Sequence, residues 1–412
     1  MKHPAAPCSE IGLPMRLALS GHSALSALRE LRASGVDLSK LPKTTLPAPD
    51  PSPRKRWTKP ALSERAWSYA HKDMLEVTVP TAKTRIRTSG IECIVCSPEL
   101  LGNSYIHIGD GLYIPSPELL FVQMGRHLSP IAHALLGMEL CGTYVRPKTY
   151  GVGAVTTAQQ LASFAENTQR VDGVLQARIV ARRVLDNAWS PMESIVAQLA
   201  SLPLHEMGYG LGPLDLNPRI AGQDMQAGSR VPDIVVRGTM VGLNYEGEGH
   251  FDLPGIVSAT TEAVLNPGSS ASQQALDAAI AKTREKYVGD RRRDRDLWQA
   301  GLTVFPVTKE DLYQEGAFDS LMLSVYAAIE RSAGRNMRYQ RERILDTRLK
   351  HERQLRIWSL LPGDVGRRAR DELRAELPNS APYQDYLLEE DDGLLFFVPA
   401  GEGTHAFAKS PC

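Results

Sequence analysis

The chain contains 412 residues, of which 42% are hydrophobic and 23% are charged, and its formal net charge is zero. This composition is that of an ordinary globular protein and excludes wholesale disorder. At roughly 150 residues per domain, the length predicts two or three domains. A net charge of zero argues against a globally basic nucleic-acid-binding protein, although it is compatible with a local basic face.

The sequence predicts neither a membrane span nor an export signal. It contains no stretch of about 18 uninterrupted apolar residues, the length that a membrane-spanning helix needs. The first residues lack the long apolar core of a signal peptide. We therefore expect a cytoplasmic protein without a membrane partner.

The five cysteines form an odd, sparse set that is unlike a disulfide framework. Cys93 and Cys96 make a C-x-x-C pair. A structural zinc site normally needs four ligands, and the sequence offers no second C-x-x-C and no H-x-x-x-H. We therefore interpret these two cysteines as small buried residues.

Residues 1–60 are expected to hold a short amphipathic helix at 19–35 and a proline-rich linker. Residues 61–150 predict a small α+β domain, in which short β-rich runs between 74 and 115 precede two helices. Each of these helices begins with Ser-Pro, a cap followed by a first-turn proline. This domain is a candidate for a regulatory or DNA-binding role. A helical connector is expected at 151–189.

Residues 190–313 predict a second α+β domain. Its expected order is a helix, a Gly/Pro-rich loop, two strands, helices at 271–287 and 290–301, and a strand at 302–308 whose proline suggests an edge or a bulge. Residues 314–412 are expected to form a charged helix at 335–358 and a tail. Acidic and basic residues alternate along this helix, which favours a solvated helix over one that packs on a partner or on DNA.

The stretch "RVPDIVVRGTMVGLNYEGEGHF", residues 230–251, contains the strongest candidate site. In a strand, Asn244, Glu246 and Glu248 project to one face. If the preceding strand pairs with this one as a hairpin, Asp233 approaches Glu246. Converging carboxylates are the ligands that Mg²⁺ prefers, so we predict a Mg²⁺ (or Mn²⁺) site made by Asp233, Glu246 and Glu248. The alternative is a polar hairpin with solvent-facing acids, in which the adjacent like charges would repel.

Two further residues have both a structural and a catalytic interpretation. His250 follows the second strand and is a candidate general base, although a lone histidine near a turn is more often a surface or packing residue. Glu193 lies three residues after Ser190 in "SPME", the pattern of a capping box, which is a sufficient structural reason for it. A nuclease site could also use Glu193.

The order of these motifs resembles the PD-(D/E)xK nuclease superfamily, and within it the small endonuclease domains related to very-short-patch-repair enzymes. The resemblance rests on Ser-Pro-x-Glu at 190–193, Pro-Asp at 232–233, Asn-x-Glu at 244–246 with His250, Asp290-x-x-Arg-Asp with Leu297 and Gly301, and "LTVFPVT". It implies a restriction-endonuclease-like mixed sheet flanked by helices, α/β in the core and α+β overall, preceded by a smaller α+β domain.

The resemblance also implies roles for individual residues. Asp233 and Glu246 would bind the divalent cation, and Glu193 and His250 would assist. Arg293 and Asp294 correspond to an Arg-Asp pair of the later helix, or form a salt-bridging helix face, and Arg291 and Arg293 are candidate nucleic-acid contacts. Asn244 stands where the related domains usually carry glutamate, and Glu248 stands where the superfamily motif carries lysine.

Residues 20–145 resemble the N-terminal part of proteins that are distantly like abortive-infection antitoxin-type regulators. The resemblance is carried by "GHSALSALREL", "GLYIPSPELLFVQMG" and "MELCGTY". Two functions are therefore expected from the sequence. One is a metal-dependent DNA endonuclease in defence, mobile-element or repair work. The other is a non-enzymatic DNA-binding or antitoxin-like regulator that carries a degenerate nuclease domain.

Overall fold

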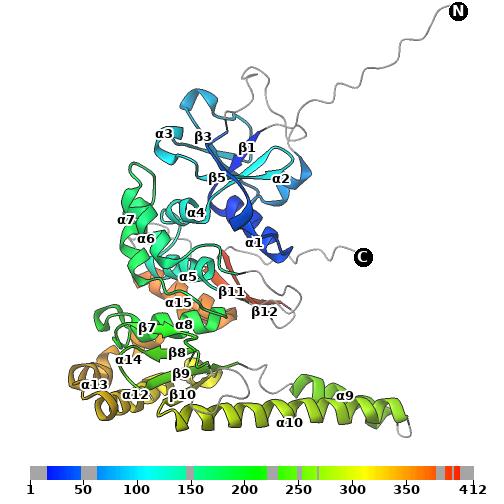
Figure 1. The fold of residues 1–412 in the computed structure, drawn as a ribbon, viewed down its shortest axis with the longest axis vertical. Coiled ribbons are helices and arrows are strands. Elements are labelled where there is room, and N and C mark those ends of the chain that lie inside the picture. The colour runs from blue at the N-terminus through cyan, green and yellow to red at the C-terminus, as the bar shows by residue number, and fades with distance from the viewer. Residues whose placement is uncertain are drawn as a thin grey trace, which may run out of the picture. The chain divides into compact units, whose positions relative to one another are not determined.

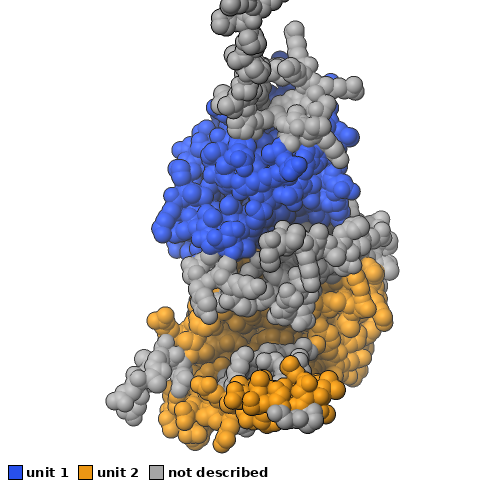
Figure 2. Space-filling model, turned by 90° about the vertical axis from the view of Figure 1, so that its right-hand side faces the viewer, with its two compact units in different colours: residues 1–133, 146–182, 401–412 blue, residues 134–145, 183–400 orange. Residues whose placement is uncertain are grey.

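The computed structural model describes residues 16–47, 63–144, 153–219, 231–247, 253–266, 269–376, 386–391 and 394–399. The chain forms two compact units, coloured separately in Figure 2: unit 1 comprises 1–133, 146–182 and 401–412, and unit 2 comprises 134–145 and 183–400. The division falls within helix α5 (Pro130–Cys141). In the described residues, no helix is both long and apolar enough to cross a membrane.

Unit 1 is built on a six-stranded mixed sheet in the order β2-β5-β6-β1-β3-β4. The strands are β1 (Leu17–Leu19), β2 (Lys43–Thr44), β3 (Leu75–Val79), β4 (Ile91–Val95), β5 (Tyr105–Gly109) and β6 (Leu112–Pro115). Strand β1 is central, pairing parallel with β6 and antiparallel with β3. The stretch expected to precede the first domain therefore supplies a middle strand of that domain's sheet.

Helices α1 (Gly21–Ala33) and α4 (Pro117–Met124) contact each other and pack against this sheet. Helices α6 (Ala158–Asn167) and α7 (Val174–Val180) pack on α4, and the shorter α2 (Glu64–Ser68) and α3 (Pro98–Leu101) connect strands. The Ser116 side chain accepts the N–H of Leu119, so the predicted Ser-Pro helix start is confirmed for α4. All eight residues of α4 are buried, which makes it the central helix of unit 1.

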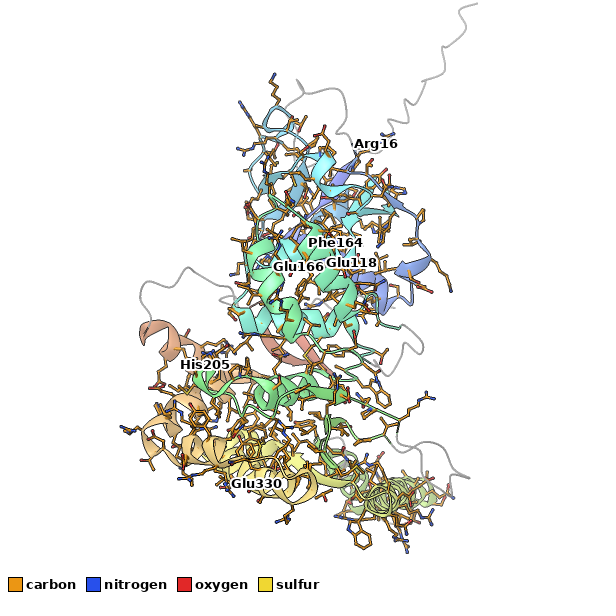
Figure 3. All side chains as sticks on the ribbon, turned by 60° about the vertical axis from the view of Figure 1, so that its left-hand side comes forward. Arg16, Glu118, Phe164, Glu166, His205 and Glu330 are labelled. Carbon is orange, nitrogen blue, oxygen red and sulfur yellow. The ribbon has the colours of Figure 1, made fainter. Side chains whose placement is uncertain are left out.

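The acid that follows the first-turn proline of α4, Glu118, is buried and labelled in Figure 3. Thr156 Oγ1 donates to its carboxylate at 2.8 Å, and Lys43 Nζ lies 3.2 Å from it. Burial opposes ionisation, but the bonds from Ser116 and Thr156 and the charge of Lys43 outweigh it and lower the pKa of Glu118. This acid is therefore fully satisfied within the fold.

Unit 2 contains a four-stranded mixed sheet in the order β10-β9-β8-β7. The strands are β7 (Leu214–Leu216), β8 (Ile234–Val236), β9 (Val241–Glu246) and β10 (Thr303–Thr308). The first three are antiparallel neighbours, and β10 pairs parallel with β9. Helix α8 (Pro191–Ser201) contacts β9, and the predicted mixed α+β architecture is confirmed. Strand β10 is an edge strand, as its internal Pro306 predicted.

A long helical hairpin lies between β9 and β10 in the chain. Helices α9 (Leu253–Leu265) and α10 (Ser270–Gln299) run side by side and extend away from the sheet (Figure 1). The two helices predicted at 271–287 and 290–301 are one continuous helix, because Gly289 between them keeps helical geometry. The C-terminal end of α10 leads directly into β10, so this helix ends beside the sheet.

The expectation of a single solvated charged helix at 335–358 is wrong in its continuity and in the burial of one of its arginines. The segment breaks into α13 (Arg338–Leu345) and α14 (Lys350–Ser359), which pack near α11 (Lys309–Tyr313) and α12 (Ala317–Ala333). Arg353 is buried and donates to both carboxylate oxygens of Asp319 at 2.9 Å, and Tyr209 Oη donates to the same carboxylate at 2.7 Å. Arg353 is therefore a buried cation with a specific partner, whereas Arg338 and Glu342 of the same segment stay exposed.

The remaining described elements of unit 2 are helix α15 (Gly363–Glu376), which packs on α14, and the antiparallel pair β11 (Tyr386–Asp391) and β12 (Leu394–Pro399). In unit 1, Cys93 of β4 is half-buried and Cys96 is buried, and neither forms a disulfide. Burial raises the pKa of both thiols, that of Cys96 to about 11. Both therefore stay protonated, as expected for small packing residues.

Candidate metal centre

The predicted hairpin exists and places Asp233 against the second strand. Strands β8 and β9 pair antiparallel, with Ile234 opposite Leu243. Just before β8, the Asp233 N–H donates to Asn244 Oδ1 at 2.9 Å, and Asp233 Oδ2 accepts the N–H of Tyr245 at 2.7 Å. Both the backbone and the carboxylate of Asp233 are thereby fixed against β9.

Glu193 reaches the same region from the first turn of α8. Ser190 caps this helix by accepting the N–H of Glu193 at 3.1 Å. The Glu193 carboxylate accepts the N–H of Trp189 at 2.9 Å and Asn217 Nδ2 at 3.0 Å, and hydrogen bonds with Ser190 also act to lower its pKa. The serine cap forms as the sequence predicted, and the carboxylate also bonds to donors outside the helix.

The charge of Glu193 acts on Asp233. Burial, and then the charge of Glu193, raise the pKa of Asp233 to about 7, although the bond from Tyr245 N–H and the charge of Arg293 act against this. Burial also raises the pKa of Glu193, against the bonds that it accepts. Each carboxylate therefore makes the other harder to ionise, and near neutral pH the pair holds less negative charge than two free acids.

Glu246 is the last residue of β9 and lies opposite Thr308 in the parallel pairing with β10. Its side chain is partly exposed, and its charge also raises the pKa of Asp233. The hairpin thus brings Glu246 into the surroundings of Asp233. Glu248 and His250 lie outside the described residues.

The arginines predicted as nucleic-acid contacts lie in the C-terminal third of α10. Arg293 is 22% exposed in its side chain and acts on Asp233 as a nearby positive charge. Arg291 is more exposed, and Asp294 lies 3.7 Å from Arg291 and 3.8 Å from Arg293. Asp294 thus pairs with arginines on its own helix, as the interpretation of a salt-bridging helix face predicts, and the charge of Arg293 also acts on Asp233.

A second cluster was not anticipated from the sequence. In the described residues, the potential ligands whose atoms all lie within 4.8 Å of one another are His22, Glu76 and His127 of unit 1. These residues are far apart in the chain, so no spacing pattern in the sequence predicts that they lie together. The one local signal is Glu76, an acid within the apolar strand "LEVTV".

No protein-family model, curated protein or solved structure matches the chain.

Proposed function

We propose that unit 2 is a divalent-metal-dependent endonuclease that cleaves DNA, with Mg²⁺ or Mn²⁺ held by Asp233 and Glu246. The observation that carries the proposal is the Asp233 carboxyl, whose pKa of about 7 reflects burial and the facing charge of Glu193. Two such acids held together destabilise their own ionised forms. A divalent cation bound by Asp233 and Glu246 would favour the charged state of Asp233, and hard oxygen ligands suit Mg²⁺.

The positions of the acids support a site that is open to substrate. Asp233 immediately precedes β8 and Glu246 ends β9, so both lie at the same end of the hairpin, and Glu246 is partly exposed. Mg²⁺ bound there would lower the pKa of a coordinated water and offset the charge of a scissile phosphate. Glu193, which already accepts two hydrogen bonds, is suited to orient Asp233 and the neighbouring water.

The order of the elements also supports the proposal. A helix, three antiparallel strands, a helical hairpin and a fourth strand parallel to the third occur in the order α8, β7, β8, β9, α9, α10 and β10. A mixed sheet with flanking helices is also what the resemblance to restriction-endonuclease-like domains implies. One of the two acids lies just before β8 and the other ends β9.

The basic end of α10 supports DNA as the substrate. Arg291, Arg292 and Arg295 are exposed there, one turn or less from Arg293, whose charge already acts on Asp233. Lysine and arginine side chains bind the phosphate backbone irrespective of base sequence. A duplex that contacts these arginines would bring a phosphate toward the acidic pair.

The test uses the purified full chain with supercoiled plasmid, linear duplex and single-stranded RNA, each with Mg²⁺, Mn²⁺ or chelator. We expect metal-dependent nicking of DNA, reduced on the order of 100-fold or more in Asp233→Asn and in Glu246→Gln, as when a group that stabilises developing charge is removed. Asp215→Asn is the matched control. That acid lies on the neighbouring strand β7, where it pairs with the exposed Arg237, and its variant should cleave like the parent.

Cleavage that is equal in Asp233→Asn and in the parent would overturn the proposal, and so would the absence of cleavage on every substrate. Duplex binding that falls with salt but ignores metal and both substitutions would favour the DNA-binding regulator instead. Preferential cleavage of the RNA would keep the site but change its substrate. Circular dichroism of each variant establishes that a loss of activity is not a loss of fold.

A further inference from the structure

Three side chains from three separate elements of unit 1 converge in its interior. His22 lies in the first turn of α1, Glu76 lies on β3, and His127 follows α4. His22 Nδ1 is 3.2 Å from Glu76 Oε1, and His127 Nε2 is 3.9 Å from the same oxygen. The three ligand atoms all lie within 4.8 Å of one another.

His22 and the neighbouring His71 are not bonded like ordinary core histidines. Within the described residues, Nε2 of His22 and Nε2 of His71, whose ring stacks on His22 at 4.6 Å, are buried without a hydrogen-bond partner. His133, elsewhere in the unit, shows the usual arrangement: its Nε2 lies 2.8 Å from the Phe121 carbonyl and its Nδ1 lies 3.3 Å from Gln176 Nε2. Buried polar atoms are normally satisfied, so the rings of His22 and His71 differ from that of His133. The Nδ1 of His22, which is the nitrogen on the other side of the ring from the unpaired Nε2, faces Glu76.

We propose that His22, Glu76 and His127 form a binding site for a divalent transition-metal ion of the Zn²⁺ class. Ligands that bind Zn²⁺ tetrahedrally at about 2.0–2.1 Å lie roughly 3.3 Å apart, and the separations of 3.2 and 3.9 Å from Glu76 Oε1 bracket that value. Two imidazoles and one carboxylate favour Zn²⁺ and its first-row neighbours over Mg²⁺, which prefers oxygen alone. This site is independent of the acidic pair in unit 2.

The backbone of α1 is shaped around the carboxylate. The His22 N–H donates to Glu76 Oε2 at 2.5 Å, and the Glu76 N–H donates to Ser23 Oγ at 3.0 Å. Gly21 has φ of +51°, and a Cβ there would overlap Glu76 Oε2 and approach His127 Nε2 to 3.3 Å. The start of α1 therefore holds Oε2 of Glu76, and Oε1 of the same carboxylate lies toward the imidazoles of His22 and His127.

Arg126 competes with the ion for one ligand. Its Nε donates to His127 Nε2 at 2.8 Å, and its guanidinium also pairs with Glu92 at 3.2 Å. The bond shows that His127 Nε2 carries a lone pair, as a ligand atom must. Because Glu92 offers Arg126 a second partner, the guanidinium can release the imidazole when an ion binds.

The experiment measures Zn²⁺ and Co²⁺ binding to the full chain in an Asp233→Asn/Glu246→Gln background, which removes the acidic site of unit 2. We expect one equivalent of either ion to remain bound after dialysis, and bound Co²⁺ to show the visible absorption of a low-coordinate nitrogen and oxygen site. His127→Gln and Glu76→Gln should each weaken binding at least about tenfold. Arg126→Gln, which removes the competitor, should bind at least as tightly as the background protein.

His107→Gln is the matched control, because His107 is an exposed histidine of β5 in the same unit, and it should change nothing. If Glu76→Gln fails to fold, His127→Gln decides the outcome, since His127 lies after a helix and is partly exposed. Absence of stoichiometric binding in the background protein would overturn the proposal. Binding equally tight in His127→Gln and in the background protein would overturn it as well.

Discussion

Asn244 Oδ1 accepts the backbone N–H of Asp233 at 2.9 Å, across the antiparallel pairing of β8 and β9. Asn244 is 4% exposed and Asp233 is partly buried, so the bond is shielded from solvent on the Asn244 side. Asn244, which stands where the related domains usually carry an acid, therefore positions Asp233 on the neighbouring strand. The charges of Glu193 and Glu246 still act on Asp233 in the presence of this amide.

This relationship predicts a stability loss in Asn244→Ala. The variant leaves the Asp233 N–H without its acceptor, which costs about 1–3 kcal/mol in the free energy of unfolding of unit 2. Urea unfolding followed by tryptophan fluorescence measures it. Asn336→Ala is the control, because Asn336 makes the same kind of bond to the N–H of Arg338 at an exposed position where water can replace it. Equal losses in the two variants would contradict the positioning role.

The raised pKa of Asp233 predicts a pH-dependent difference between the parent and Asp233→Asn. The folded pKa is about 7 and the unfolded value is about 3.9. Because the folded pKa is the higher, the stability from the protonated carboxyl is fully present below the unfolded pKa and is lost as pH rises through 7. In metal-free buffer, the parent should therefore lose stability relative to Asp233→Asn as pH rises. The melting temperature of the variant minus that of the parent should increase between about pH 5 and about pH 8.

Subtracting the two melting curves removes the contributions of the histidines, which are the same in both proteins. Saturating Mg²⁺ should stabilise the parent and leave Asp233→Asn nearly unchanged. A melting-temperature difference that stays constant across the pH range would show that Asp233 ionises like an exposed acid.

Local patterns in the sequence predicted local structure well. The serine cap at Ser190, the Ser-Pro start of α4 and the edge position of β10 each depend on residues within a few positions of one another. The pairing of Asp233 with β9 followed from strand alternation and one short turn. These features are fixed by backbone geometry, so their residue types were sufficient to predict them.

The features that the sequence did not predict depend on contacts between distant residues. His22 and Glu76 are separated by 54 positions, and Asp319 and Arg353 by 34. Alternating charges at 335–358 are typical of a solvated helix, and the burial of Arg353 depends on an acid of α12 and a tyrosine hydroxyl before β7. Residue spacing in the sequence does not predict such contacts, because tertiary packing determines which charged residues form ion pairs.

The buried pair of Arg353 and Asp319 predicts a large effect of Arg353→Leu. This variant leaves the Asp319 carboxylate in the interior with the Tyr209 hydroxyl as a donor but without its cation. Removing one partner of a buried ion pair lowers the free energy of unfolding by about 3–5 kcal/mol. Urea unfolding of unit 2 measures this loss. Arg338→Ala, which removes an exposed helix pair with Glu342, should hardly shift the midpoint. Similar shifts in the two variants would contradict the burial of Arg353.

The close approach of α1 to Glu76 predicts different effects for two glycine substitutions in the same segment. Gly35 has φ of +76°, and a Cβ added there would meet nothing within 4 Å, so Gly35→Ala should cost only the left-handed backbone strain, roughly 1–2 kcal/mol. Gly21→Ala adds an overlap with Glu76 Oε2 and should lower the melting temperature of unit 1 further. Equal melting temperatures would show that α1 does not enclose the carboxylate.

The central claim, that the acids of unit 2 hold a divalent cation, is tested most directly by calorimetric titration of the metal-free protein with Mg²⁺ near pH 7. We predict binding at one site, with proton release that makes the heat depend on the buffer, because the Asp233 carboxyl is part-protonated there. Glu76→Gln should retain this binding, and the Asp233→Asn/Glu246→Gln double variant should lose it. Mg²⁺ binding of equal affinity in the double variant, or no binding to the parent protein, would contradict the account.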